Sequence, residues 1–256
     1  MIYFERDYTC DSADLNYPRV LWDNICPRGT VAASTSAEGR AAVNAATATT
    51  FDRWEPTTLP AWWKLTFTEE AINAVAIDTH TIGSTGSSIA LQEWNGSAWV
   101  DVVPAVSPAD DEPIAFLFAK RETDRIRVYI TGSEAPTIAV VHCSSSLVLP
   151  QKVYMGVATP VDLAQQTEFD TTRSANGAYL GRSVLRKKNT NDFQVEHLTE
   201  RFVREAVMPF INSARETPYF LLERPYQFPA SLSYRWRDDD ITPERMGVRS
   251  FMKVTI

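Results

Sequence analysis

Short segments in which apolar and polar residues alternate recur along the first half of the chain, and this pattern constrains the fold most. Side chains at alternate positions of an extended strand lie on opposite faces, so each segment predicts a strand with one buried face. The dipeptide Asn95-Gly96, between Trp94 and Trp99, is a strong β-hairpin signal. Strands spaced in this way, with almost no helical period, predict a β-sandwich or barrel. The segments are 72–80, 87–94, 98–103, 113–119, 125–130 and 137–143.

The stretch LPAWWKLTF places two tryptophans side by side in such a strand. An extended backbone would put Trp63, Leu65 and Phe67 on one face. Trp62 and Lys64 would then lie on the opposite face. The stretch therefore predicts a half-buried strand in which one tryptophan is core and its neighbour is not.

The second half of the chain has a different pattern, which begins after the serine cluster and proline of residues 144–156. Within the 256 residues we therefore expect two domains, 1–148 and 149–256. Thr199 stands at the N-cap position of a helical pattern, and Pro209 is expected to end or kink that helix. Strand-like stretches surround it at 191–198, 217–224, 231–236 and 250–256.

Composition excludes several classes of function. The formal charge of −7 and the pI near 5.1 argue against a protein that covers nucleic acid, which usually needs a basic face. No apolar run is long enough to span a bilayer, and the charged start does not resemble a secretion signal. Cys10, Cys26 and Cys143 are too few and too widely spaced for a zinc site, and buried thiols are the expected state. A bridge between Cys10 and Cys26 is the alternative.

The motifs that carry catalysis are not found. The sequence has no phosphate-binding glycine loop, no nucleophile elbow and no paired-histidine metal helix. His80, His142 and His197 are far apart on different expected strands. Asp238–Asp240 could bind a cation, but an exposed acidic turn is the commoner meaning of such a run. We therefore expect no catalytic residues, no metal and no cofactor.

Two groups of residues are candidates for binding. Exposed tryptophans at the loop end of a β-sandwich can stack on a sugar ring, although most tryptophans are core. A shallow ligand site is expected near Arg53, Trp54, Glu55 and His80. The basic run RSVLRKK could meet an acidic partner surface, or it could be a strand edge protected by charge. As an assembly surface it would use Arg182, Arg186, Lys187 and Lys188.

The first domain resembles the coagulation-factor type C, or discoidin-like, galactose-binding family. The resemblance implies a jelly-roll β-sandwich, with Trp63 as its core anchor and Trp62 on its outer side. Residues 43–46 lack the aspartate and glycine of the calcium-binding loop that many members have, so the resemblance does not extend to a calcium site. The matching positions are Asn44, Thr47, Trp54, Trp62, Trp63, Ile72, Val75 and Ile77.

The second domain resembles the C-terminal part of tail proteins of long-tailed bacteriophages. In those proteins a glycine and arginine segment precedes a strand, a helix ending in Pro-Phe, an aromatic and proline stretch and a Tyr-x-Trp strand. The resemblance implies a smaller β-rich domain with one packed helix. The matching positions are Gly177, Gly181, Arg182, Arg186, Pro209, Phe210, Tyr219, Phe220, Pro225, Pro229, Tyr234 and Trp236.

Together the two resemblances imply a structural protein of a phage tail tip or baseplate. It would be made in the host cytoplasm, without membrane insertion, and would become part of the virion. It would assemble through its C-terminal domain, as a homo-oligomeric ring, with other tail proteins. The sandwich would adhere to host glycan or dock a neighbouring tail protein. The alternatives are a free lectin-like carbohydrate-binding module and a glycan-processing enzyme, and no acidic pair singles out the enzyme.

Overall fold

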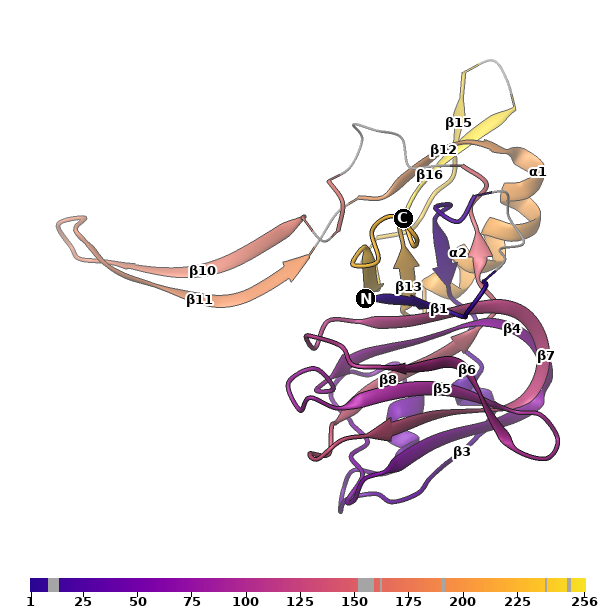
Figure 1. Ribbon diagram of the computed structural model, residues 1–256. Helices are drawn as coiled ribbons and strands as arrows, with labels where there is room; N and C mark the ends of the chain where they lie inside the picture. The colour runs from indigo at the N-terminus through magenta and orange to yellow at the C-terminus, as the bar shows by residue number, and fades with distance from the viewer. Residues whose placement is uncertain (9–13, 152–158, 162, 190–191, 238, 248–249) are drawn as a thin grey trace.

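The computed structural model describes residues 1–8, 14–151, 159–161, 163–189, 192–237, 239–247 and 250–256 (Figure 1). The chain is mainly β, with a sandwich in its N-terminal part. A smaller β-rich part with one packed helix follows, so the predicted fold class is confirmed. No helix within these residues is long and apolar enough to cross a membrane.

Two long strands, β4 (Ala61–His80) and β7 (Ile114–Thr131), run through both layers of the sandwich. The first layer contains β3, the first half of β4, the second half of β7, β5 and β6. The second layer contains β8, the other halves of β4 and β7, and β1. The shorter strands are β1 (Ile2–Phe4), β3 (Thr30–Ala33), β5 (Ser88–Trp94), β6 (Trp99–Val106) and β8 (Ile138–Ser144).

The segments 59–67 and 72–80, expected as separate strands, are parts of the single strand β4. Register shifts between Thr66 and Glu70 and between Ile72 and Ala74 bend it from one layer into the other. A β-bulge adds a residue to one strand only, so it turns the strand without ending it. Segments 113–119 and 125–130 join in the same way into β7.

The predicted alternation in the first half of β4 is confirmed. Trp63 and Leu65 are fully buried in the sandwich core, and Phe67 is 9% exposed. Trp62 and Lys64 point to the other face and are half-buried. The predicted hairpin also forms, since Trp94 pairs with Trp99 and Gly96 has a φ of 95°.

A four-stranded sheet lies between the sandwich and the helix. Its order is β14-β13-β2-β9, and β2 (Arg19–Leu21) pairs with β13 (Tyr219–Leu222) although the two are far apart in the sequence. Every residue of β13 is buried, because one face packs on the sandwich and the other on the helix. The remaining strands of this sheet are β9 (Leu147–Val148) and β14 (Leu232–Arg235).

Small residues on the second layer let this sheet approach closely. Ala74 and Ala76 point away from the sandwich core and pack in one buried cluster with Phe220 and Leu222. The cluster also contains Leu21, which comes from the N-terminal part of the chain. The two parts of the chain therefore share a hydrophobic core rather than a loose contact.

The helix runs from Glu200 to Ala214 as α1 (Glu200–Phe202), the π-helical segment η3 (Val203–Val207) and α2 (Met208–Ala214). Thr199 caps it as expected, since its Oγ1 accepts a hydrogen bond from the Phe202 N–H at 3.3 Å. Pro209 does not end the helix. The π-type turn just before it changes the backbone hydrogen bonding where the proline has no N–H to donate.

A three-stranded sheet covers the helix from another side. Its order is β12-β16-β15, and Val195, Leu198 and Val254 join the helix core. The strands are β12 (Gln194–Thr199), β15 (Glu244–Met246) and β16 (Phe251–Thr255).

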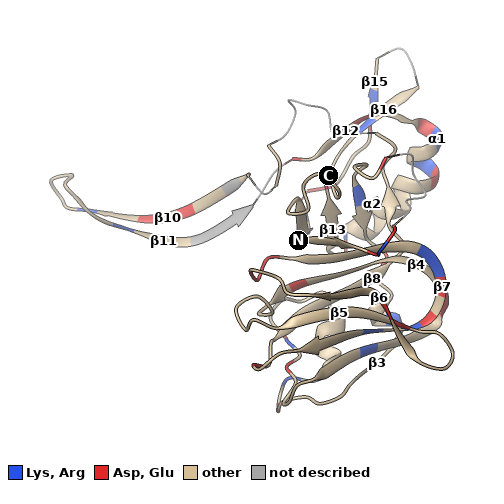
Figure 2. Ribbon diagram, in the orientation of Figure 1, with Lys and Arg blue, Asp and Glu red and all other residues tan. Residues whose placement is uncertain are grey.

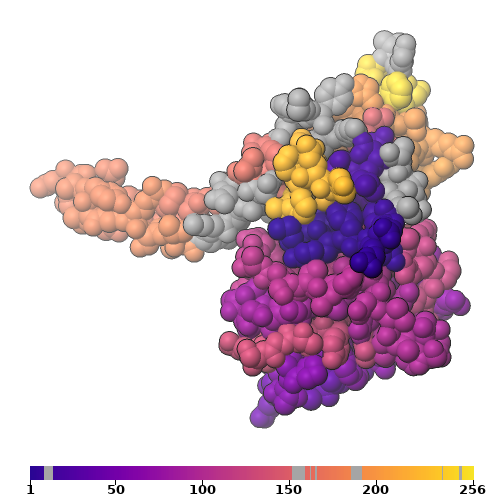
Figure 3. Space-filling model, viewed as in Figure 1, coloured from indigo at the N-terminus to yellow at the C-terminus, as the bar shows by residue number. Residues whose placement is uncertain are grey.

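A long β-hairpin projects from the body of the molecule (Figures 1 and 3). It consists of β10 (Gln165–Arg173) and β11 (Tyr179–Asn189), which pair only with each other. Asn176-Gly177 lies in its turn, where Gly177 has a φ of 81°. The hairpin is the most extended feature of the fold.

Cys26 and Cys143 are buried free thiols, as expected. Burial raises the pKa of Cys26 to about 12, so the thiol stays protonated. Cys10, the other half of the alternative bridge, lies outside the described residues.

Candidate functional site

Trp54, the aromatic residue of the expected ligand site, is fully buried in the sandwich core. Its backbone forms a bridge to Ile138, with both N–H to O distances below 3 Å. Its indole Nε1 donates a hydrogen bond to the Thr35 carbonyl oxygen at 3.1 Å. No ring face is left for a ligand, so Trp54 is a core anchor and does not fit the expected stacking role.

His80 is also buried, with 3% exposure, and its hydrogen bonds define its tautomer. Nδ1 accepts a hydrogen bond from the Ile82 N–H at 3.2 Å, so the proton lies on Nε2. Nε2 then donates to the Glu112 carbonyl oxygen at 2.9 Å. Burial lowers the pKa of His80, and the neutral ring connects two loops at this end of the sandwich.

Arg53 and Glu55 are half-buried at the same end. The Arg53 guanidinium donates to Thr137 Oγ1 at 3.5 Å, and Thr137 in turn bonds to Thr81. Arg53 therefore lies near the loop that follows His80. The four expected residues share a region, but they form no common aromatic and polar surface because Trp54 and His80 point inward.

The expected assembly residues lie on the projecting hairpin. Arg182 is exposed on β11, and its guanidinium lies over the ring of Phe169 on β10. Arg186, Lys187 and Lys188 belong to the same strand, but their side chains lie outside the part of the chain that the structure describes. The hairpin thus carries the whole basic run away from the body.

Apolar side chains on the hairpin are unusually exposed. Phe169 and Val184 are directly opposed across the two strands, and they are 41% and 53% exposed. Tyr179, Leu180 and Leu185 are each at least 60% exposed. An isolated two-stranded hairpin is marginally stable in water, and exposed apolar patches commonly mark contact surfaces.

The hairpin and the remainder of the chain have formal charges of opposite sign. In Figure 2 charged residues of both signs are seen on the hairpin strands and over the body of the molecule. Residues 165–189 contain five basic and two acidic residues, a formal charge of +3. The whole chain has a formal charge of −7, so the residues outside the hairpin have a formal charge of −10. The basic hairpin therefore projects from an acidic remainder.

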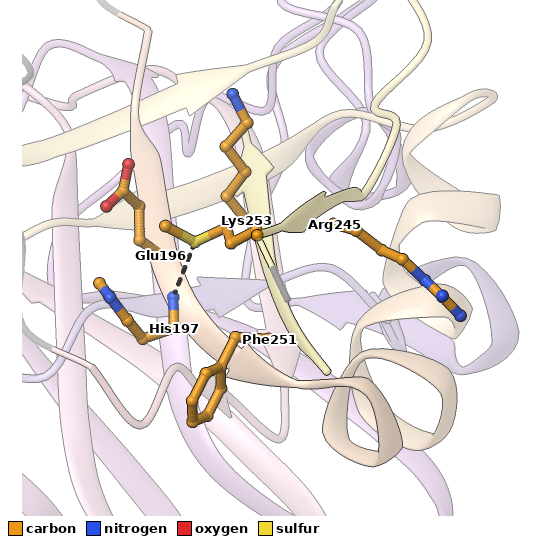
Figure 4. A pocket seen from close by; sticks show the side chains of 7 residues that line it. Glu196, His197, Arg245, Phe251 and Lys253 are labelled. Carbon is orange, nitrogen blue, oxygen red and sulfur yellow. Dashed lines mark hydrogen bonds between the residues drawn. The ribbon is translucent and has the colours of Figure 1, made fainter. Parts of the chain in front are cut away.

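A shallow groove of about 580 Å³ lies on the three-stranded sheet (Figure 4). His197 lines it, with its N–H directed at the Met246 sulfur at 3.5 Å and its ring 6.0 Å from that of Phe251. The charged side chains of Glu196 and Arg245 point in different directions in Figure 4. The groove therefore lacks polar groups that converge on one point, which a specific small-molecule site requires.

The β10–β11 hairpin is not among the elements predicted from the sequence. Asn176-Gly177 is the same signal that identified the hairpin at Asn95-Gly96, and strand-like segments flank it on both sides. Polar residues are frequent in β10, so the alternation of apolar and polar residues is weak there.

The acidic turn Asp238–Asp240 is described only in part, and Asp240 there pairs with Arg215 at 3.2 Å.

No protein-family model and no curated protein matches the sequence. Several of the solved structures similar to this chain are carbohydrate-binding modules. Chitosan-binding module 1 of a chitosanase/glucanase from Paenibacillus sp. IK-5 is 18% identical, with a TM-score of 0.42, and the match covers 48% of this chain and 98% of the module. The family 32 module of C. perfringens NanJ, in complex with galactose, is 13% identical with a TM-score of 0.42, over 49% and 98%. A pectin-binding module is 19% identical with a TM-score of 0.40, over 47% and 93%.

Proposed function

We propose that this protein is a structural component of a bacteriophage tail tip or baseplate that assembles through the β10–β11 hairpin. The observation that carries the assembly role is the projecting hairpin, whose apolar side chains stay exposed in the single chain. The tail assignment rests on the sequence resemblance of the second part. The sandwich is the part presented for adhesion to host glycan or for docking a neighbouring tail protein.

The assembly contact is made between the hairpin of one copy and the body of the next. The two surfaces differ, so the contact is heterologous and generates a ring when the rotation between copies closes. The opposite charges of the hairpin and the remainder favour this arrangement. Exposed charges are screened by salt, so the assembly is expected to weaken as ionic strength rises.

The test is multi-angle light scattering of the full chain, with negative-stain imaging of the same sample. We expect a discrete ring. The double variant Phe169→Asp, Val184→Asp places two carboxylates on the hairpin's apolar face and is expected to be monomeric, with the amides of β4 and β7 still protected as in a folded sandwich. Phe51→Asp is the matched control, because Phe51 is 88% exposed in a loop of the sandwich.

Equal oligomer size in the double variant and the wild type would contradict the role of the hairpin. A monomeric wild-type chain that still binds glycan would instead favour the free lectin-like module. The expectation that the chain is not an enzyme stays a prediction.

A further inference from the structure

The first layer of the sandwich has an outward face on the side opposite the second part of the chain. The second part packs on the other layer, through the alanines of β4. Across the outward face runs one row of cross-strand neighbours, one from each of four strands. The row is Lys64, Arg127, Gln92 and Asp101, of which the first three are half-buried and the last is exposed.

Aromatic rings flank the two cations of this row. Trp62 and Tyr129 are directly opposed on β4 and β7. The guanidinium carbon of Arg127 lies 4.5 Å from the ring centre of Trp99 and 5.3 Å from that of Tyr129. Lys64 Nζ lies 5.7 Å from the ring of Trp62. The aromatic–cationic face is the set Trp62, Lys64, Gln92, Trp99, Arg127 and Tyr129.

Hydrogen bonds hold Arg127 in place without neutralising it. Its Nε donates to Gln92 Oε1 at 2.6 Å, and Gln92 Nε2 donates to Asp101 Oδ1 at 2.7 Å. Among the described residues, neither the Nη groups of Arg127 nor Lys64 Nζ has a hydrogen-bond or carboxylate partner. Arg125, one row away, differs because its Nε donates to Asp124 at 3.1 Å.

We infer that the aromatic–cationic face binds a polysaccharide that carries carboxylate groups. Sugar rings would stack on Trp62, Tyr129 and Trp99, because amphipathic aromatic rings offer an apolar surface to the C–H side of a sugar. The free Nη pair of Arg127 matches a carboxylate in a bidentate arrangement, and Lys64 supplies a second positive charge beside it. The inference rests on the glycan-adhesion part of the proposed function and names the class of glycan.

The composition of this face favours an acidic glycan over nucleic acid. A single-stranded nucleic acid also uses aromatic stacking, but it needs a positively charged groove along its whole backbone. On this face the two unpaired cations, Lys64 and Arg127, share their cross-strand row with the carboxylate of Asp101. The whole chain has a formal charge of −7. Sparse positive charge between aromatic rings fits occasional carboxylates better than a continuous run of phosphates.

The test is isothermal titration calorimetry of the full chain with hexagalacturonate and with its fully methyl-esterified form. The two ligands share their sugar rings and differ in charge. We expect the acid form to bind. We expect the affinity for the ester to be at least about tenfold lower, since charge-assisted hydrogen bonds are lost. Arg127→Gln is expected to weaken binding of the acid form about tenfold. Lys120→Gln removes the same charge from an exposed site at the β7 bend and is expected to have no effect.

Three outcomes would overturn the inference. They are equal affinity of Arg127→Gln and the wild type, equal affinity for acid and ester, and no binding of either form. Tight, Arg127-dependent binding of a single-stranded oligonucleotide would assign the face to nucleic acid instead. Light scattering on the same samples reports the hairpin assembly separately, so a failure here is distinguishable from a failure of the proposed assembly.

Discussion

At the residue scale, His142 on β8 is expected to couple folding to pH. It is fully buried between the sandwich and β13, with its ring 5.6 Å from that of Phe220 and Nε2 3.2 Å from Ser144 Oγ. Burial lowers the pKa of His142 from 6.5 to about 3. Between these values the unfolded chain binds a proton that the folded chain does not. The free energy of unfolding therefore falls as pH drops through 6.5 and levels off below about 3, by up to about 5 kcal/mol in all.

The measurement is urea unfolding of the wild type and of His142→Gln between pH 7 and pH 4. The variant has no imidazole to titrate, so its free energy of unfolding is expected to depend less steeply on pH. The difference between the two curves isolates His142 from the other titrating groups. Parallel curves would show that the proton reaches His142 without opening the fold.

At the element scale, the β10–β11 hairpin is expected to be the least protected sheet of the free chain. Its two strands pair only with each other, and most of its described side chains are exposed, so local opening costs little. In the assembled wild type, amide hydrogen exchange in β10 and β11 is expected to be slow. In the Phe169→Asp, Val184→Asp variant it is expected to approach the rate of unstructured peptide.

The amides of β4 and β7 serve as the internal control, because both strands are paired on either side within the sandwich. Their exchange is expected to be equally slow in both proteins. Slow exchange of the hairpin in the monomeric variant would mean that the hairpin is stable alone and needs no partner.

At the scale of the whole molecule, the two parts of the chain are expected to unfold together. Strand β2 completes the sheet of β13, and Phe220 lies in the cluster that the sandwich shares with that sheet. Phe220→Ala removes a fully buried ring and is expected to lower the stability by about 3–5 kcal/mol. Calorimetry is expected to show one transition in both proteins, shifted as a whole in the variant. Two transitions, of which only one shifts, would show separate folding units.

The sequence predicts those features of the fold that depend on residues close together in the chain, and it does not predict those that depend on contacts between distant segments. The strands, the Asn95-Gly96 hairpin and the Thr199 cap depend on residues close together in the chain, and all three are confirmed. The bends in β4 and β7 depend on register shifts against a partner strand. The sequence pattern therefore predicts two short strands where the structure has one long bent strand. The sequence predicts Trp54 at a ligand site, whereas the structure buries it, because the residue type does not show the depth at which its loop packs.

The sequence by itself determined that this chain is mainly β and that Trp63 and Trp62 lie on opposite faces, because the period of two is a property of the local backbone. Only the tertiary structure decided which outward faces stay open. Ala76 and Lys64 both point away from the sandwich core from the same strand β4. The first is covered by a sheet formed from residues near both ends of the chain, whereas the second remains half-exposed beside Arg127. Contacts between distant segments make that difference, and no local pattern contains them.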